Sequence, residues 1–197
     1  ARLEIYETLL RKWQASINLV APSTLDEIWN RHFWDSAQLV PLAPNASTWL
    51  DLGSGAGFPG LVVAILLADR PGFTTRLVES DQRKSIFLRE VIRATGAPAT
   101  VHTVRIEQFV WPEGEPLPDV VSARALAALP KLLGWASSFW GKATIGLFLK
   151  GQGASAELTE SAKDWIFESE AIASQSDPSG TVLKLWGLRH ANPGLER

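Results

Sequence analysis

The chain of 197 residues has the length of one ordinary domain. Hydrophobic residues make up 46% of it and charged residues 20%, which is typical of a globular protein with a substantial core. The absence of Cys excludes a disulfide framework, a thiolate metal site and a thiolate nucleophile. A net charge of −2 argues against a broadly basic nucleic-acid-binding surface, although a local basic patch is compatible with it.

Two helices are predicted in residues 1–44, which we interpret as a helical extension that ends near Pro41 and Pro44. Residues 3–19 carry apolar side chains at the spacing of an amphipathic helix. Thr24-x-x-Glu27 has the spacing of a capping box, so a second helix is predicted from there. Its apolar face is expected to be Leu25, Ile28, Trp29 and Phe33. Most Trp residues are expected in the core, among them Trp13, Trp29, Trp34, Trp49, Trp135 and Trp140.

Residues 30–36 of this second helix read Asn-Arg-His-Phe-Trp-Asp-Ser. A helix that only packs against its neighbours does not require this mixture of polar and aromatic side chains. The pattern alone leaves two interpretations open. His32 and Asp35 are either structural groups satisfied by hydrogen bonds or members of a functional site.

The stretch 48–60, Thr-Trp-Leu-Asp-Leu-Gly-Ser-Gly-Ala-Gly-Phe-Pro-Gly, predicts a strand, a glycine-rich turn and the start of a helix. Glycine lets the backbone turn sharply and lets a ligand approach it closely. In nucleotide-binding α/β folds the free N–H groups of such a turn face the ligand. We therefore predict that this loop holds a cofactor within a Rossmann-like core, residues 45–197.

Two cofactor patterns overlap in this loop. Residues 55–60 read GxGxxG and Glu79 follows about 20 residues later, which fits the dinucleotide fingerprint. Residues 51–57 read DxGxGxG, which resembles motif I of class I S-adenosylmethionine (SAM) methyltransferases. Phe58 and Pro59 stand where a pyrophosphate would need a bare backbone at close range. The loop therefore favours SAM over NAD.

Strands and helices alternate along the rest of the core. Helices are predicted at 59–68, 82–95, 129–140 and 153–163, and strands at 74–79, 100–104, 119–123 and 144–150. Two last strands, near 165–173 and 181–189, flank a turn sequence at 177–180. Such alternation finished by an antiparallel hairpin is typical of the seven-stranded methyltransferase sheet, and it also favours SAM.

Ligands of open α/β sheets bind outside the carboxyl ends of the strands. Glu79 stands at one such end and can accept hydrogen bonds from both ribose hydroxyls of a cofactor. Ile106 can cover one face of an adenine while Glu107 meets its polar edge, and Arg124 can hold a methionine carboxylate or a substrate phosphate. Each of them is otherwise an ordinary strand-end residue, and Lys84 either snorkels to solvent or reaches a phosphate.

The residues that are absent from the sequence restrict the chemical class of the atom that accepts the methyl group. The chain has no Asn-Pro-Pro-Tyr-type tetrad for an amino acceptor and no Cys that could add to a pyrimidine ring. A ring nitrogen such as guanine N7 carries a free lone pair, so its methylation by in-line displacement requires alignment but no general base. We assign no catalytic base. We also assign no metal, because the three His residues lack ligand spacing.

Together these motifs resemble the bacterial 16S ribosomal RNA guanine-N7 methyltransferase G family, also called glucose-inhibited division protein B. The resemblance covers nearly the whole chain, and it rests on Tyr6-x-x-Leu9-Leu10-x-x-Trp13, Ile17-Asn18-Leu19, Arg31-His32-Phe33-x-Asp35-Ser36, the 51–60 loop, Val78-Glu79-Ser80, Lys84-x-x-Phe87-Leu88, Arg105-x-Glu107, Ala123-Arg124-Ala125-Leu126 and Lys150-Gly151. The chain departs from the family's usual residues at Gln14, Val20 and Arg83, none of which lies in the cofactor loop.

The resemblance implies a SAM-dependent enzyme that methylates a guanine N7 of 16S ribosomal RNA. Combined with the strand-end residues, it gives a cofactor-binding set of Asp51, Gly53, Gly55, Gly57, Phe58, Glu79, Ile106, Glu107 and Arg124. The expected RNA-side residues are Arg31, His32, Asp35, Ser36, Lys84, Arg124 and Lys150.

The expected partner is the RNA of the small ribosomal subunit, and the expected oligomeric state is a monomer. No signal peptide or membrane-length apolar run is present, so a cytoplasmic location is expected. Since the chain lacks Met and starts at Ala1, a few native N-terminal residues are expected to be missing. Two alternatives stay open: a small-molecule methyltransferase, and a noncatalytic RNA-binding or assembly protein. The intact glycines and Glu79 argue against the second.

Overall fold

The computed structural model describes residues 1–192, so the last five residues of the predicted core lie outside the described part of the chain. A central sheet contains β1 (Thr48–Leu52), β2 (Thr74–Val78), β3 (Ala99–His102), β4 (Val120–Arg124), β5 (Ile145–Lys150), β6 (Trp165–Ala173) and β7 (Thr181–His190). The seven strands lie in the order β3-β2-β1-β4-β5-β7-β6. Neighbours from β3 to β5 are parallel, and β7 runs antiparallel to both β5 and β6. The predicted Rossmann-like sheet with an antiparallel last strand is confirmed.

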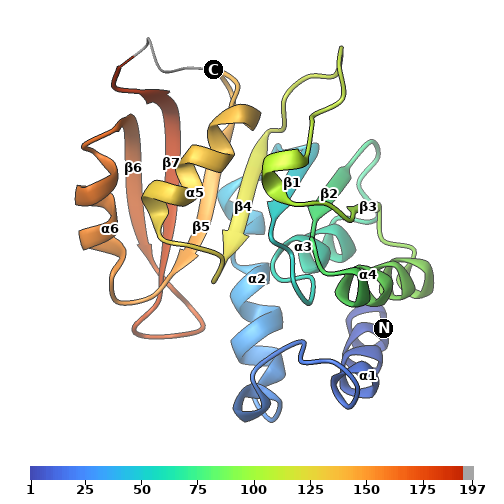
Figure 1. Ribbon diagram of the computed structural model, residues 1–197. Helices are drawn as coiled ribbons and strands as arrows, with labels where there is room; N and C mark the ends of the chain where they lie inside the picture. The colour runs from blue at the N-terminus through green and yellow to red at the C-terminus, as the bar shows by residue number, and fades with distance from the viewer. Residues whose placement is uncertain (193–197) are drawn as a thin grey trace.

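Helices cover both faces of the sheet (Figure 1). On one face lie α1 (Arg2–Gln14), α3 (Gly60–Leu66) and α4 (Gln82–Thr95), which share a hydrophobic cluster. On the other face lie α5 (Leu129–Ala136) and α6 (Ala154–Ser161). Short 3-10 turns complete the chain at η1 (Pro22–Thr24), η3 (Val40–Leu42), η4 (Ile106–Gln108) and η5 (Ser137–Phe139).

The alternation of side chains along β1 explains why both faces are covered. Leu50 and Leu52 belong to the cluster under α5, while Trp49 points to the opposite face and is 1% exposed. Asp51 shares the face of Trp49 and is completely buried. The polar residue at the end of β1 therefore lies inside the protein.

Helix α4 begins and ends where the sequence predicts. The Asp81 carboxylate accepts a hydrogen bond from the Lys84 backbone N–H at 3.0 Å, which satisfies one free donor of the first turn. Gly96 ends the helix in the left-handed conformation, with φ of 66°. This helix carries Lys84 at its start, beside the carboxyl end of β2.

The prediction of a regular second helix is wrong. Residues Trp29–Trp34 (η2) form a π-helix, and only the short α2 (Asp35–Ala37) is α-helical. The predicted capping box is absent: Thr24 ends the 3-10 turn η1, and its hydroxyl lies 2.7 Å from the Ala21 carbonyl, to which it donates, and 2.7 Å from His32 Nε2. The wider π-helical turn changes the angular spacing of side chains. Trp29 and Trp34 are consequently 44% and 49% exposed, against the expectation that they lie in the core.

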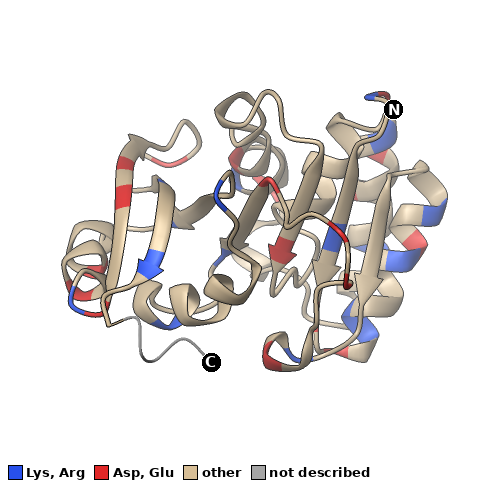
Figure 2. Ribbon diagram, turned by 90° about the horizontal axis from the view of Figure 1, so that it is seen from above, with Lys and Arg blue, Asp and Glu red and all other residues tan. Residues whose placement is uncertain are grey.

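The N-terminal segment packs beside the carboxyl ends of the parallel strands, with α1 and α2 below that edge in Figure 1. Charged positions of both signs are scattered over the ribbon (Figure 2). No helix within residues 1–192 is long and apolar enough to cross a membrane.

Candidate functional site

The glycine loop after β1 is confined from both sides. Gly53, Gly55 and Gly57 all have positive φ, at 64°, 57° and 99°. A Cβ on Gly53 would lie 2.4 Å from a methyl carbon of Leu126, and a Cβ on Gly57 would lie 2.4 Å from the Tyr6 hydroxyl oxygen. The backbone therefore occupies space in which a side chain has no room.

Tyr6 of α1 holds this loop from behind. Its hydroxyl donates a hydrogen bond to the Ala56 carbonyl, and its ring is stacked on Phe58 with centroids 5.5 Å apart. The side chain is completely buried, and burial raises its pKa well above the ordinary value. Tyr6 thus stays a neutral donor, and the N-terminal helix takes part in shaping the loop.

Asp51 lies under the loop and does not line the cavity beyond it. The Ser122 hydroxyl donates to Asp51 Oδ1 at 2.7 Å, whereas Oδ2 has no hydrogen-bond partner within residues 1–192. Burial raises the Asp51 pKa to about 6. Gly57 also lies outside the cavity lining, against Tyr6. Direct cofactor contacts are predicted at both positions, and in this structure both residues lie behind the cavity lining.

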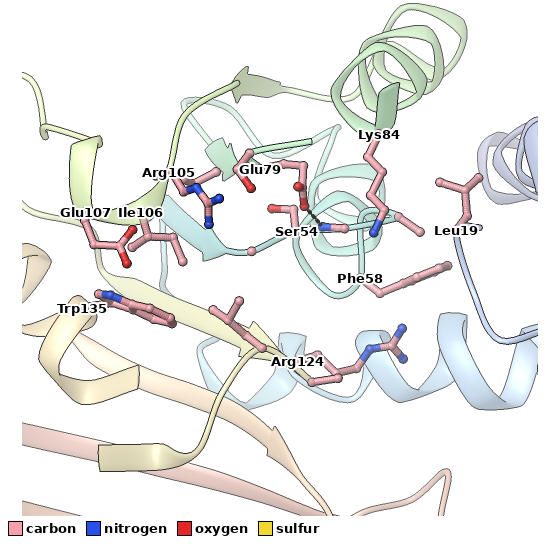
Figure 3. Close-up of a pocket in the computed structure, with 17 residues that line it drawn as sticks. Leu19, Ser54, Phe58, Glu79, Lys84, Arg105, Ile106, Glu107, Arg124 and Trp135 are labelled. Atoms are coloured by element: carbon pink, nitrogen blue, oxygen red, sulfur yellow. Dashed lines mark hydrogen bonds between the residues drawn. The ribbon is translucent and has the colours of Figure 1, made fainter. Parts of the chain in front are cut away.

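A cavity of about 400 Å³ opens outside the carboxyl ends of β1, β2 and β4. Its lining includes eight residues of the predicted set: Gly53, Gly55, Phe58, Glu79, Lys84, Ile106, Glu107 and Arg124. Figure 3 shows how the side chains of Glu79 and Lys84 point into the cavity. Lys84, expected on the RNA side, therefore faces the cofactor cavity. The volume is that of an ordinary small-molecule site.

The other lining residues were not predicted as site residues, among them Leu19, Ser54, Arg105, Leu126 and Trp135. Arg105 directly precedes Ile106 and Glu107, which were predicted for the site, so its place in the sequence already indicated that it could line the cavity. Trp135 comes from α5, and only the packing of that helix against the sheet brings its indole to the cavity.

Glu79 is held in place by the backbone around it. Its Oε2 accepts from the Gly55 N–H at 2.7 Å, and its Oε1 accepts from the Asp81 N–H at 2.7 Å. An ionised carboxylate offers about four acceptor positions, so two stay available for further donors. A pair of ribose hydroxyls supplies two such donors.

The rest of the cavity also fits a nucleoside that carries a charged amino-acid tail. Apolar surface from Ile106, Leu126 and Trp135 suits an adenine ring. Lys84 and Arg105 supply positive charge for a carboxylate. The donor set of this cavity is therefore compatible with SAM.

Arg124, at the end of β4, joins the cofactor loop to the π-helix. Its Nη1 donates to the Arg31 carbonyl and to Asp35 Oδ2, both at 3.1 Å, and its Nη2 donates to His32 Nδ1 at 2.9 Å. The guanidinium carbon lies 4.9 Å from the centre of the Phe58 ring. Residues predicted separately from the segments at 31–35 and 124 thus meet in one cluster.

His32 is neutral in this cluster. Burial, together with the charges of Arg124 and Arg31, lowers its pKa to about 4. Because Nδ1 accepts from Arg124, the ring proton is on Nε2, which lies 2.7 Å from the Thr24 hydroxyl. With both nitrogens engaged, His32 is not free to act as a general base. Ser36, also predicted for the site, is fully buried and donates to the His32 carbonyl at 2.7 Å.

The π-helix also holds the loop between β6 and β7, residues 174–180. Arg31 Nη1 lies 2.8 Å from Asp177 Oδ2, and the Ser176 hydroxyl donates to Asp35 Oδ1 at 2.5 Å. Arg31, expected to contact RNA, is therefore paired with an acid in this structure. Lys150 lies at the end of β5, where its ammonium group is 2.7 Å from Glu157 Oε2.

Comparison with known proteins agrees with the geometry. A family model described as rRNA small subunit methyltransferase G, GidB, matches residues 1–179. The chain is 64% identical over 188 residues to the ribosomal RNA small subunit methyltransferase G of Parvibaculum lavamentivorans, which covers 95% of this chain and 82% of that protein. It is 54% identical over 185 residues to the protein of the same name from Rhodospirillum centenum, covering 93% and 82%.

Solved structures are similar to it in fold. A mutant of MtNAS in complex with S-adenosylmethionine gives a TM-score of 0.59 at 15% identity, covering 94% of this chain and 71% of that one. A putative O-methyltransferase from Klebsiella pneumoniae also gives 0.59 at 15% identity, covering 91% and 88%. At these identities the likeness concerns the fold alone.

Proposed function

The chain belongs to the GidB family, the rRNA small subunit methyltransferases G, and from that membership we propose that it methylates N7 of one guanine in 16S ribosomal RNA. It is a SAM-dependent methyltransferase of class I fold. The observation that supports the proposal most directly is the Glu79 carboxylate, which is fixed by two backbone N–H groups at the wall of a nucleoside-sized cavity.

The proposed cofactor contacts follow from the cavity lining. Glu79 would accept from the ribose hydroxyls, Ile106 and Glu107 would meet the adenine, and the loop from Gly53 to Phe58 would face the middle of the cofactor. Lys84, with Arg105 and Arg124 beside it, would offset the carboxylate charge. When bound, SAM supplies an electrophilic methyl group.

The proposed acceptor is a ring nitrogen, which requires no general base, and no general base is assigned among residues 1–192. Guanine N7 has a lone pair available at neutral pH, so no proton has to be removed before it attacks. His32, whose ring nitrogens are both engaged, fits this assignment. What the protein must supply is orientation and the exclusion of competing water.

The remaining parts of the proposal concern partner and place. The substrate is the RNA of the small ribosomal subunit, and the protein acts as a cytoplasmic monomer. The scattered charges suit a small RNA contact area in which the assembled subunit contributes to recognition (Figure 2).

A calorimetric titration tests the cofactor first. S-adenosylhomocysteine is expected to bind with micromolar affinity, NAD is expected not to bind, and Gly55→Val is expected to abolish binding because its positive φ disfavours a β-branched residue. Binding of NAD would contradict the cofactor assignment. Binding of neither would favour a noncatalytic assembly protein.

The acceptor is tested with small ribosomal subunits from a bacterium that lacks a methyltransferase of this family. Labelled methyl groups should appear at a single guanine of 16S RNA. Treatment that cleaves RNA at N7-methylguanine should then break the chain at that position. Label on an exocyclic amine or on a small molecule instead would overturn the proposal.

A further inference from the structure

A second cavity, of about 520 Å³, lies next to the cofactor cavity. The two share Arg124, Ala125 and Leu126, so the segment that follows β4 forms the wall between them. Ala125 has φ of 51° and is the one residue other than glycine with a positive φ in the described chain. Such conformations are unfavourable for L-residues and cluster at functional sites. The strained wall places whatever occupies the second cavity directly beside the cofactor.

The far side of this cavity is formed by an ion pair between β5 and α6. Lys150 is only 9% exposed, and its ammonium group donates to Glu157 Oε2 and to the Ala127 carbonyl, each at 2.7 Å. Glu157 Oε2 also accepts from the Leu129 backbone N–H at 2.6 Å. These contacts fix both side chains, and they leave Glu157 Oε1 without a hydrogen-bond donor from residues 1–192.

The charges around the cavity argue against a phosphate as its occupant. Three carboxylates, from Asp35, Glu157 and Asp177, line it together with two cations, Arg124 and Lys150. Both cations already have carboxylate partners, Asp35 for Arg124 and Glu157 for Lys150. Asp177 is likewise paired with Arg31, so within residues 1–192 no cation at the cavity is left without a carboxylate partner for a phosphate. A neutral ligand with N–H donors requires only acceptor oxygens that are still free.

The free groups instead match the edge of a purine. Glu157 Oε1 is an acceptor, and the third hydrogen of the Lys150 ammonium is a donor beside it. Guanine presents N1–H and N2–H₂ donors next to its O6 acceptor on its Watson–Crick edge. Adenine presents an acceptor at N1, which a carboxylate repels. N7 lies on another edge and stays free to face the wall at Ala125.

We propose that this second cavity receives the target guanine of the proposed reaction, unstacked from its RNA, with its Watson–Crick edge read by Glu157 and Lys150. The assignment rests on the proposed function, since it names the site of the acceptor base. Bases that undergo chemistry leave the stack to enter such pockets, and RNA-binding proteins read unstacked bases at this edge. Glu157 is thereby a specificity-determining residue.

Glu157→Gln tests the assignment. The amide oxygen must face the Lys150 ammonium and the Leu129 N–H, so the amide NH₂ is directed into the cavity where Oε1 was. Donor then meets donor, and methylation of small subunits is expected to fall about 10- to 100-fold in kcat/KM, the range for a hydrogen bond to a charged group. Affinity for S-adenosylhomocysteine should stay within about twofold of wild type, since Glu157 does not line the cofactor cavity.

Glu160→Gln is the matched control. Glu160 lies on the same helix, but its partner is Lys163 and both side chains are exposed. This variant should methylate like wild type. If wild type is active and Glu157→Gln retains its full rate, or if Glu157→Gln loses cofactor affinity together with activity, the assignment is overturned. If wild type methylates no guanine, the proposed function itself fails.

A change in the base separates recognition from a merely structural role. The target guanine is replaced by hypoxanthine, which lacks only the 2-amino group, in 16S RNA ligated from fragments and reconstituted into subunits. Wild type is expected to lose about tenfold in kcat/KM, and Glu157→Gln is expected to lose little more, because the contact is already broken. Equal penalties in the two proteins would overturn the assignment.

Discussion

The N-terminal segment is attached to the sheet domain in two contrasting ways. Helix α1 is attached through aromatic packing behind the glycine loop, where Tyr6 is completely buried between Phe33, Phe58 and Phe87. The π-helix contributes Phe33 to that packing, but its polar side chains and Asp35 after it are attached to the loop 174–180 through one ion pair and hydrogen bonds. The first attachment is part of the hydrophobic core and the second is not.

Because of this difference, one part of the site can move without disrupting the other. Breaking the aromatic attachment exposes apolar surface and alters the cofactor loop. Separating the polar attachment exchanges hydrogen bonds within the protein for hydrogen bonds to water, at a small net cost. Arg124 lies between the two, against Phe58 on one side and Asp35 on the other. The cofactor cavity is expected to be rigid. Access to the second cavity, the proposed site of the target guanine and here called the acceptor cavity, is expected to be adjustable.

The largest effect on stability is expected where a side chain is added to the glycine loop against the aromatic cluster around Tyr6. Gly57→Ala introduces a Cβ at 2.4 Å from the Tyr6 hydroxyl oxygen in a residue with φ of 99°. Overpacking and the backbone conformation together should lower the free energy of unfolding by about 3 kcal/mol. Urea unfolding of the variant and of wild type measures this decrease. Gly72→Ala is the control, since it has φ of 76° but nothing within 4 Å, and it should cost only about 1 kcal/mol. Equal costs would show that the aromatic attachment is loose.

Removal of one hydroxyl on the same side should have the next largest effect. Tyr6→Phe keeps the stacked ring and leaves the Ala56 carbonyl without its buried donor. The free energy of unfolding should fall by about 1–2 kcal/mol, and affinity for S-adenosylhomocysteine should fall because the loop is less well held. Trp29→Phe, at an exposed position of the π-helix, should change stability by less than about 0.5 kcal/mol. An unchanged cofactor affinity in Tyr6→Phe would disconnect α1 from the cofactor site.

Asp51 under the glycine loop and His32 of the π-helix should change the stability of the folded protein in opposite directions as the pH changes. The Asp51 pKa is raised from 3.8 to about 6, so the folded protein binds the extra proton and stability from this group is lost as pH rises through about 6. The His32 pKa is lowered from 6.5 to about 4, so stability from this group is lost as pH falls from 6.5 through about 4.

Thermal unfolding between pH 4 and 6.5 separates these contributions. In wild type they partly cancel. Asp51→Asn should melt at progressively lower temperature than wild type as the pH is lowered, because the His32 contribution is no longer offset. His32→Gln should show the reverse trend relative to wild type. Parallel curves for all three proteins would contradict both pKa shifts.

The smallest effect on stability is expected where the polar attachment between the π-helix and the loop 174–180 is weakened. Arg31→Ala removes an ion pair with Asp177 in which the two side chains are 41% and 29% exposed. The free energy of unfolding should fall by less than about 1 kcal/mol, with a difference that shrinks at high salt. Cofactor affinity should not change, whereas the KM for small subunits should rise if the freed loop or Arg31 itself meets RNA. A loss of more than about 2 kcal/mol would make the polar attachment a part of the core.

Local rules of the sequence account for the elements that surround the cofactor. The cap at Asp81, the stop at Gly96 and the positive φ of Gly53 all follow from what those residues do in any chain. The carboxyl ends of parallel strands meet at one edge, so the placement of Glu79 and Ile106 beside one another was predictable before any contact was known.

What the sequence could not show depends on tertiary packing. The direction of Asp51, inward to Ser122, is set by which face of β1 each residue occupies. Trp135 reaches the cavity only through the docking of α5. The segment Trp29–Trp34 has the apolar pattern of an ordinary helix but is a π-helix, and it contacts the loop 174–180, which is distant in the sequence. The direct contacts proposed with cofactor and RNA stay predictions.

The contact between the π-helix and the loop 174–180 also has a consequence for the folding of the protein during its synthesis. Arg31 and Asp177 are separated by 146 positions along the chain. During translation the first helices emerge long before the loop that they hold, so Arg31 lacks its partner Asp177 until the hairpin of β6 and β7 has left the exit tunnel. A nascent chain stalled before residue 174 would already contain the entire glycine loop and β4. It would nevertheless lack one wall of the acceptor cavity, so the newly made protein acquires its ability to select RNA last.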